Sequence, residues 1–155
     1  IPVGGNRFDE AIINKIKKDM NFVIGEKSAE AIKKNIASAY ATDAQMDICG
    51  RNLVTGLPSE ITVTGECVHE ALAELFQSIV DSIKIILERT PPEISSDIYK
   101  SGLYLTGGSS RIQNLGQFIY DELGLKVNLC EEPESTVIMG LGAVIEDPQL
   151  AKLAL

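Results

Sequence analysis

The stretch Leu103-Tyr104-Leu105-Thr106-Gly107-Gly108-Ser109-Ser110 decides the predicted fold. It predicts a short strand, a tight glycine turn and the beginning of a helix over 109–123. Ligands of open α/β sheets bind beyond the carboxyl ends of strands, where the chain turns into a helix. Glycine has no Cβ, so the backbone can approach a ligand closely, and Ser109 or Ser110 could cap the helix. The same spacing also fits a plain strand-to-helix turn, so the residues alone leave both interpretations open.

The rest of the chain predicts a mixture of helices and strands. After the glycine turn a strand and a helix follow again, and this β-α-β-α order predicts two neighbouring parallel strands. Pro91-Pro92 is expected to end a long central core helix, since proline cannot continue the hydrogen-bond ladder. Asn6 is expected to cap the first helix. Apolar periodicity and turn residues predict helices over 6–22, 26–40, 66–89, 109–123 and 135–146, and strands over 45–50, 60–64, 103–106 and 126–129.

The composition excludes several function classes. The chain of 155 residues is 45% hydrophobic and carries a net charge of −8, which excludes disorder and, without a basic stripe, nucleic-acid binding. No run reaches the roughly 20 apolar residues that cross a bilayer, so no direct membrane insertion is expected. Three cysteines, Cys49, Cys67 and Cys130, form no C-x-x-C pair, and we expect buried free thiols in a reducing cytoplasm.

A second candidate site is Glu30-Ala31-Ile32-Lys33-Lys34, inside the helix predicted over 26–40. Its carboxylate and two ammonium groups share one helical surface, where they could hydrogen-bond a ribose and a base or form only an exposed ion pair. His69 lacks neighbouring metal ligands and is expected to be structural, and the three carboxylates within 131–134 are expected to be solvated. The P-loop pattern is absent, and no catalytic or metal site is predicted.

Six stretches follow one another in the order Val3-Gly4-Gly5-Asn6-Arg7-Phe8-Asp9-Glu10-Ala11-Ile12, Ile24-Gly25-Glu26, Ala29-Glu30, Gly50-Arg51-Asn52-Leu53, Pro91-Pro92-Glu93 and Leu105-Thr106-Gly107-Gly108. Together they resemble the MreB rod shape-determining proteins, bacterial actin homologues of the actin–Hsp70–sugar kinase superfamily. The resemblance runs from residue 1 to about residue 147 and matches only the second half of that family. Members usually have aspartate at Asn6 and a third glycine at Ser109, so the chain departs from the family pattern there.

The resemblance implies an α/β protein with the second domain of the actin-like ATPase (ribonuclease H-like) fold. A larger subdomain would comprise residues 1–15 and 66–155, and a smaller inserted subdomain would comprise residues 16–65. Family positions that contact adenosine fall on both candidate sites, so the resemblance favours ligand binding over a plain turn and a plain ion pair. The implied nucleotide-binding residues are Glu30, Ala31, Ile32, Lys33, Lys34, Gly107, Gly108, Ser109 and Ser110.

The resemblance also implies a function, that of an ATP-binding, filament-forming bacterial cytoskeletal protein that controls cell shape. Head-to-tail self-association gives open filaments, and membrane-bound cell-shape machinery is the further partner implied. The full-length family is cytoplasmic, associates with the membrane and hydrolyses ATP with Mg²⁺. Its phosphate loops and hydrolytic residues fall upstream of Ile1. Since phosphoryl transfer depends on such positioning, the isolated chain is expected to be inactive and to bind nucleotide weakly.

Two other functions stay open at this point. The chain could be half of another ATPase of the same superfamily, a sugar kinase or a chaperone. A kinase needs a substrate-binding acid in its other half, and a chaperone needs a peptide-binding domain after Leu155. The chain could also be a stand-alone α/β interaction module without a ligand, and calorimetry with ATP would distinguish that case.

Overall fold

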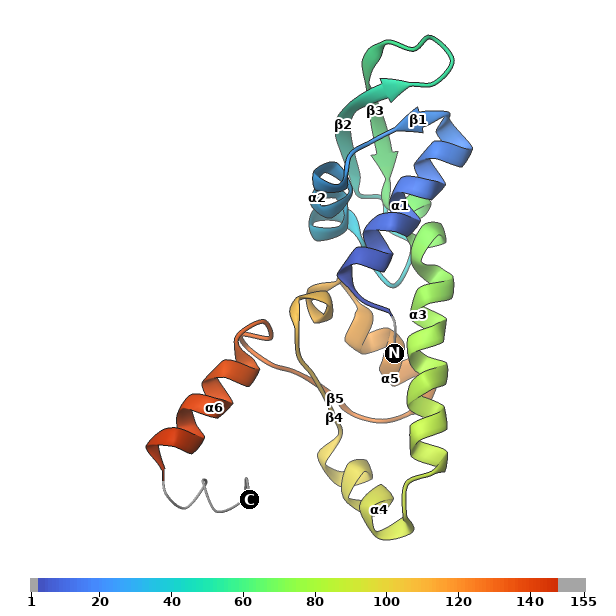
Figure 1. Cartoon of the computed structure of the whole chain (residues 1–155). Helices are drawn as coiled ribbons and strands as arrows, with labels where there is room; N and C mark the ends of the chain where they lie inside the picture. Colours follow the sequence, from blue (N-terminus) through green and yellow to red (C-terminus); the bar gives the residue numbers. More distant parts are fainter. Residues whose placement is uncertain (1–2, 148–155) are drawn as a thin grey trace.

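The computed structural model describes residues 3–147 and shows an elongated molecule (Figure 1). A small sheet lies at one end, α4 lies at the other, and the long helix α3 runs along one side. The elements in chain order are α1 (Gly5–Met20), β1 (Phe22–Val23), α2 (Glu26–Ile36), β2 (Gln45–Asn52), β3 (Pro58–Thr64), α3 (Gly65–Glu88), α4 (Pro92–Ser101), β4 (Leu103–Leu105), the 3₁₀ turn η1 (Gly108–Arg111), α5 (Leu115–Leu123), β5 (Val127–Leu129) and α6 (Thr136–Glu146).

An antiparallel sheet in the order β1-β2-β3 forms one end of the molecule. β2 and β3 pair as a hairpin, and the inward side chains Ile48 and Val63 are buried, so one face of the sheet packs on the core. Gly50 in β2 lies against the backbone and the Phe22 side chain of β1. A Cβ at this position would come within 2.4 Å of the Val23 carbonyl oxygen, so only glycine fits.

A second sheet joins β4 and β5, which run parallel as predicted. η1 and α5 make the connection between the two strands. Gly102 precedes β4 with a φ of +82°, and a Cβ there would lie 2.5 Å from the Lys126 carbonyl oxygen. The Leu103 N–H donates to that same oxygen at 2.7 Å, so glycine is what lets the two backbones meet.

The core lies where α1, α2 and α3 pack together. The side chains at one-turn spacing that are at most 1% exposed are Phe8, Ile12 and Ile16 on α1 and Val68, Leu72, Phe76 and Val80 on α3. Thr64 caps α3 by accepting a hydrogen bond from the Cys67 N–H at 3.3 Å. Ile83 still packs against the core, and beyond it the helix leaves the core, because Ile85 and Ile86 are exposed. The predicted core helix is therefore confirmed for its first part only.

Two predicted helices are shorter than their apolar periodicity indicates. α2 ends at Ile36 instead of residue 40, and the helix predicted over 109–123 is split into η1 and α5. One tertiary contact accounts for both differences, because Ser38 forms a bridge with Gln113 and the Ala39 N–H donates to the Gln113 carbonyl oxygen at 2.9 Å. Backbone groups that pair across this contact cannot also pair within a helix.

The predicted helix caps are wrong in two places. Asn6 does not cap α1, which begins at Gly5 with Gly4 as its N-cap and without a side-chain capping bond. Ser109 and Ser110 cap no helix, since the Ser110 hydroxyl donates to the Gly107 carbonyl oxygen at 2.7 Å. The elements β1 and α4 are absent from the prediction, because β1 has only two residues and α4 has no buried stripe.

α6 stands apart from the remainder of the molecule and has no buried residue (Figure 1). Its large apolar side chains are between 55% and 84% exposed, and these are Val137, Ile138, Met139, Leu141 and Ile145. Across residues 3–147, no helix combines the length and the apolar character needed to cross a membrane.

All three cysteines are free thiols, as predicted, but the prediction that they are buried is wrong. Cys49 is exposed, while Cys67 and Cys130 are half-buried. Burial disfavours the charged thiolate, so it raises the pKa of the Cys67 thiol above its ordinary value.

We expect Cys67 to react slowly with iodoacetamide at neutral pH, because only the thiolate attacks the reagent. Its rate should keep rising with pH beyond the range in which an unperturbed thiol has levelled off, because the Cys67 pKa is raised. Mass spectrometry of the alkylated peptides across this pH range measures the effect, with the exposed Cys49 as the internal comparison. Equal rates for the two thiols at neutral pH would contradict the prediction.

Candidate functional site

A cavity of about 790 Å³ opens between α1, α2 and the segment that begins with η1. Three parts of the chain that are distant in sequence contribute to its wall: the beginning of α1, one face of α2, and η1 together with the loop before α6. The lining residues are Gly5, Asn6, Asp9, Glu26, Lys27, Glu30, Lys33, Lys34, Gly108, Ser109, Arg111, Ile112 and Glu134. The two candidate sites found in the sequence therefore face the same cavity.

Five of the predicted nucleotide-binding residues line this cavity directly, namely Glu30, Lys33, Lys34, Gly108 and Ser109. The other four lie behind the wall or on another side. Ile32 is fully buried in the core, and Ala31 faces a shallow hollow beside β2. Gly107 and Ser110 shape the turn, since the Gly107 N–H donates to the Pro133 carbonyl oxygen at 2.6 Å and the Ser110 side chain is buried.

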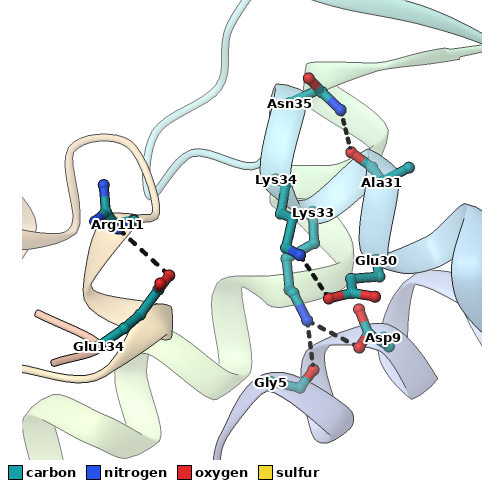
Figure 2. A network of polar contacts seen from close by, with 9 residues as sticks. All are labelled: Gly5, Asp9, Glu30, Ala31, Lys33, Lys34, Asn35, Arg111 and Glu134. Atoms are coloured by element: carbon teal, nitrogen blue, oxygen red, sulfur yellow. Dashed lines mark hydrogen bonds and ion pairs between the residues drawn. The ribbon is translucent and has the colours of Figure 1, made fainter.

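Lys33 ties α2 to the beginning of α1 across the floor of the cavity (Figure 2). Its ammonium group lies 2.8 Å from Asp9 Oδ2 and donates to the Gly5 carbonyl oxygen at 3.1 Å. The two charged side chains are only 12% and 15% exposed, so this ion pair is well shielded from water. The second oxygen, Asp9 Oδ1, is buried and has no hydrogen-bond partner within residues 3–147. The ion pair at the floor of the cavity thus includes one buried carboxylate oxygen whose hydrogen-bonding capacity is unused.

Glu30 and Lys34 form a second ion pair on the same helix, at 2.7 Å, and both side chains are largely exposed (Figure 2). The hydrogen bond from Lys34 lowers the pKa of the Glu30 carboxyl, and the same bond raises the pKa of the Lys34 ammonium. Both groups are therefore charged at neutral pH and point toward solvent at the cavity mouth. Because an exposed ion pair contributes little free energy, either group can give up this hydrogen bond and bind a ligand hydroxyl instead.

The opposite wall carries a third pair that sequence reasoning did not place in the site. Arg111 Nε lies 3.4 Å from Glu134 Oε1, and both side chains are more than half exposed (Figure 2). Glu134 belongs to the carboxylates expected to be only solvated, so that expectation missed its position at the cavity. The one available signal was its place in the group of carboxylates that follows the strand predicted over 126–129, since ligands of α/β sheets bind beyond the ends of strands.

The charges around the cavity cancel. Four carboxylates balance four cations among the lining residues: Asp9, Glu26, Glu30 and Glu134 against Lys27, Lys33, Lys34 and Arg111. α1 also begins at the cavity, and its first N–H groups have no side-chain cap, so they favour an oxygen-rich ligand group. Such a lining suits a polar, nearly neutral molecule better than a polyphosphate. No cluster of potential metal ligands occurs among the described residues.

A mixed α/β chain with two small sheets and a polar cavity between α2 and a glycine turn has the fold of the second domain of actin-like proteins. The family described as MreB/Mbl protein matches residues 1–153, and the chain belongs to this family. The family resemblance predicted from the sequence is thereby confirmed, and it favours the cell-shape proteins over sugar kinases and chaperones.

Relatives with established names support the same assignment. The chain is 40% identical over 148 residues to the cell shape-determining protein MreB of Escherichia coli (strain K12), covering 94% of this chain and 43% of that protein. It is also 40% identical over 149 residues to the cell shape-determining protein Mbl of Bacillus subtilis (strain 168), covering 95% of this chain and 45% of that protein. The chain thus spans less than half the length of these relatives.

Solved structures show the same fold. The crystal structure of MreB5 of Spiroplasma citri bound to ADP superimposes with a TM-score of 0.89 at 35% identity, over 93% of this chain and 44% of that one. The same protein bound to AMPPNP superimposes with a TM-score of 0.90 at 33% identity, covering 99% of this chain and 46% of that one. A MamK double helical filament superimposes with a TM-score of 0.73, covering 86% of this chain and 42% of that one. Because the identity is only 23%, this similarity is evidence for the fold alone.

Proposed function

We propose that this chain supplies the nucleoside side of an ATP-binding cleft in a filament-forming bacterial protein that controls cell shape. The observation that carries the proposal is that Lys33 on α2 and Gly108 at η1 line one cavity, although they lie far apart in the sequence. Two further facts support it: MreB5 of Spiroplasma citri binds ADP and AMPPNP in its crystal structures, and the named relatives are cell shape-determining proteins.

The cavity has the properties that a nucleoside requires. Its volume of about 790 Å³ lies within the roughly 300–1,000 Å³ usual for small-molecule sites. Glu30 can accept hydrogen bonds from ribose hydroxyls, and Gly108, without a side chain, lets a flat base approach the backbone. A Cβ on Gly108 would meet only the Glu134 side chain, at 3.4 Å. The wall therefore leaves room for a ring between η1 and α2.

The phosphates need groups that this cavity does not supply. Its lining charges cancel, whereas stabilising a triphosphate in phosphoryl transfer takes cations and backbone donors placed around it. We therefore assign Mg²⁺ and the terminal phosphates to other parts of the complete protein. The chain covers less than half the length of its MreB relative, so such parts exist in the relative. When bound, the nucleotide supplies the phosphoryl group, and this chain holds and orients its nucleoside.

The proposal includes a division into two lobes, with residues 16–65 as the smaller and the remainder as the larger. α1 crosses the boundary without a break, so the lobes would share one continuous helix. Nucleotide bound between α2 and η1 would then set the angle between the lobes, as in hinge-type switches. Self-association into filaments, a cytoplasmic location at the membrane and contact with membrane-bound cell-shape machinery complete the proposed role.

A bulky side chain at Gly108 is expected to weaken nucleotide binding. Gly108→Phe should lower the affinity for ADP by about tenfold or more, because the ring would occupy the space of the base. Isothermal titration calorimetry on the full chain measures this affinity. Gly25→Phe is the matched control, since Gly25 has a negative φ, open space around it and no place in the cavity wall. Unchanged ADP affinity in Gly108→Phe would reject the site.

A further inference from the structure

We propose that Glu134, Arg111 and Lys34 form a charged clasp that closes the mouth of the cavity over a bound nucleoside. In the closed clasp, the Glu134 carboxylate leaves Arg111 on its own wall and pairs with the Lys34 ammonium on α2. Glu134 is then a positioning residue, because it holds the two walls together around the ligand. The inference rests on the proposed nucleoside site and names the residues that set how firmly this site holds its ligand.

The backbone beside Glu134 is anchored to the glycine turn. The carbonyl oxygen of the preceding residue, Pro133, accepts a hydrogen bond from the Gly107 N–H at 2.6 Å and another from the Thr106 hydroxyl at 2.8 Å. The Glu134 side chain lies against Gly108, since a Cβ there would come within 3.4 Å of Glu134 Oε1. The carboxylate therefore stands beside the surface that the proposed site offers to the base.

The ion pair that holds Glu134 in the free chain is weak. Arg111 Nε lies 3.4 Å from Glu134 Oε1, which is longer than a usual N–H···O hydrogen bond. Both side chains are more than half exposed, and exposed ion pairs contribute little free energy. The Glu134 carboxylate can therefore change its partner at little cost.

Lys34 is the partner on the facing wall. Figure 2 shows Lys34 and Glu30 on one side of the cavity, and Glu134 with Arg111 on the other. The hydrogen bond to Glu30 is the main reason why the pKa of the Lys34 ammonium is raised, and the charge of Glu134 acts in the same direction. The two walls thus already interact through these charges. An ammonium group has three N–H donors, so Lys34 can keep Glu30 and bind Glu134 as well.

A bound nucleoside strengthens the attraction between the two walls. In the cavity without a ligand, solvent between the walls screens the attraction of Glu134 for Lys34. A base and a ribose that fill the cavity displace this solvent, so the same two charges attract each other more strongly. Lys33 cannot replace Lys34 in this role, because its ammonium is held at the floor by Asp9. The clasp is therefore expected to close in the complex.

Variants that remove one charge test the clasp, with ADP binding to the full chain measured by isothermal titration calorimetry. Glu134→Gln and Lys34→Met should each weaken ADP binding by about two- to fivefold, the size expected for one exposed ion pair. The double variant should bind ADP about as weakly as each single variant, since all three lack the same pair. Arg111→Gln should bind ADP more tightly, because it releases Glu134 from its partner in the free chain.

These expectations differ from those of simple charge attraction. If the cavity charges acted only on the anionic phosphates of ADP, Glu134→Gln would tighten ADP binding and Arg111→Gln would weaken it. Either of these two results would overturn the inference. Glu132→Gln is the matched control, because it removes a carboxylate from the same loop at an exposed position outside the cavity lining. Its ADP affinity should equal that of the unmodified chain.

Failure of the clasp and failure of the proposed function give different results. Unchanged ADP affinity in both Glu134→Gln and Lys34→Met would overturn the clasp and leave the nucleoside site standing. If the unmodified chain binds no ADP, the nucleoside site itself fails, and the clasp fails with it. The Lys34 and Glu134 side chains are 67% and 63% exposed, so the variants should fold like the unmodified chain, which circular dichroism checks.

Discussion

Replacing Lys33 with methionine is expected to lower the free energy of unfolding by about 3 kcal/mol, the usual cost of leaving a buried charge without its partner. The Asp9 carboxylate is 15% exposed and one of its oxygens already lacks a partner, so removing the Lys33 ammonium isolates it almost completely. The Gly5 carbonyl oxygen loses its donor in the same change. Urea denaturation measures the effect, with an unchanged m value as evidence that the folded state stays compact.

The neighbouring residue provides a matched control. Lys34→Met removes the same charge one position along α2, but its partner Glu30 is exposed, so the free energy of unfolding should stay almost unchanged. Adding Asp9→Asn to Lys33→Met should restore much of the lost stability, and the double-mutant cycle gives the coupling between the two side chains. Equal effects of Lys33→Met and Lys34→Met would show that the floor of the cavity is not shielded from water.

Phe76→Ala is expected to cost about 3–5 kcal/mol, the range for truncating a buried phenylalanine. The Phe76 side chain is 1% exposed, and its ring centroid lies 5.7 Å from that of Phe8 and 6.3 Å from that of Phe118. These rings join α3 to α1 and α5, so the resulting cavity would loosen the elements on either side of the proposed nucleoside site. Thermal unfolding and urea unfolding both measure this decrease in the free energy of unfolding.

Tyr120→Ala on α5 serves as the control for this truncation. Its side chain is about half exposed, and its loss should change stability little. We also expect Phe76→Ala to weaken ADP binding, because α1 and η1 line the cavity and are held by the same core. A Phe76→Ala chain as stable as the unmodified one would mean that the three rings do not form a joint core.

The proposed site and the folding core share the helices α1 and α2. The inner face of α2 buries Ala29, Ile32 and Ile36, while its outer face presents Glu30, Lys33 and Lys34 to the cavity. Because one helix performs both tasks, the position of the charged face depends on the packing behind it. Nucleotide occupancy and lobe position are therefore expected to be linked through α2.

Local patterns were sufficient to predict much of this chain. The apolar stripe after Thr64 predicted α3 to within a residue at each end, because periodicity over 24 residues leaves little ambiguity. The glycine pair and the two short apolar runs predicted β4, β5 and their parallel pairing. The charged face of α2 was also visible, since residues three and four apart lie on one helical surface.

Other features were decided only by contacts between distant segments. Ser38 and Gln113 pair across the molecule, and this contact ends α2 and splits the helix predicted over 109–123, although both segments have helical periodicity. The partners of Lys33 and the place of Glu134 at the cavity likewise depend on segments remote in sequence.

The amino-acid sequence by itself determined the family, the helices with long apolar stripes and the two segments that meet at the cavity. Only the tertiary structure decided which side chains of these two segments face the cavity, where the helices end and which charged side chains pair with one another. The physical reason is that helical periodicity and turn chemistry act over a few residues. Ion pairs and backbone bridges depend on distances that exist only once the chain has folded.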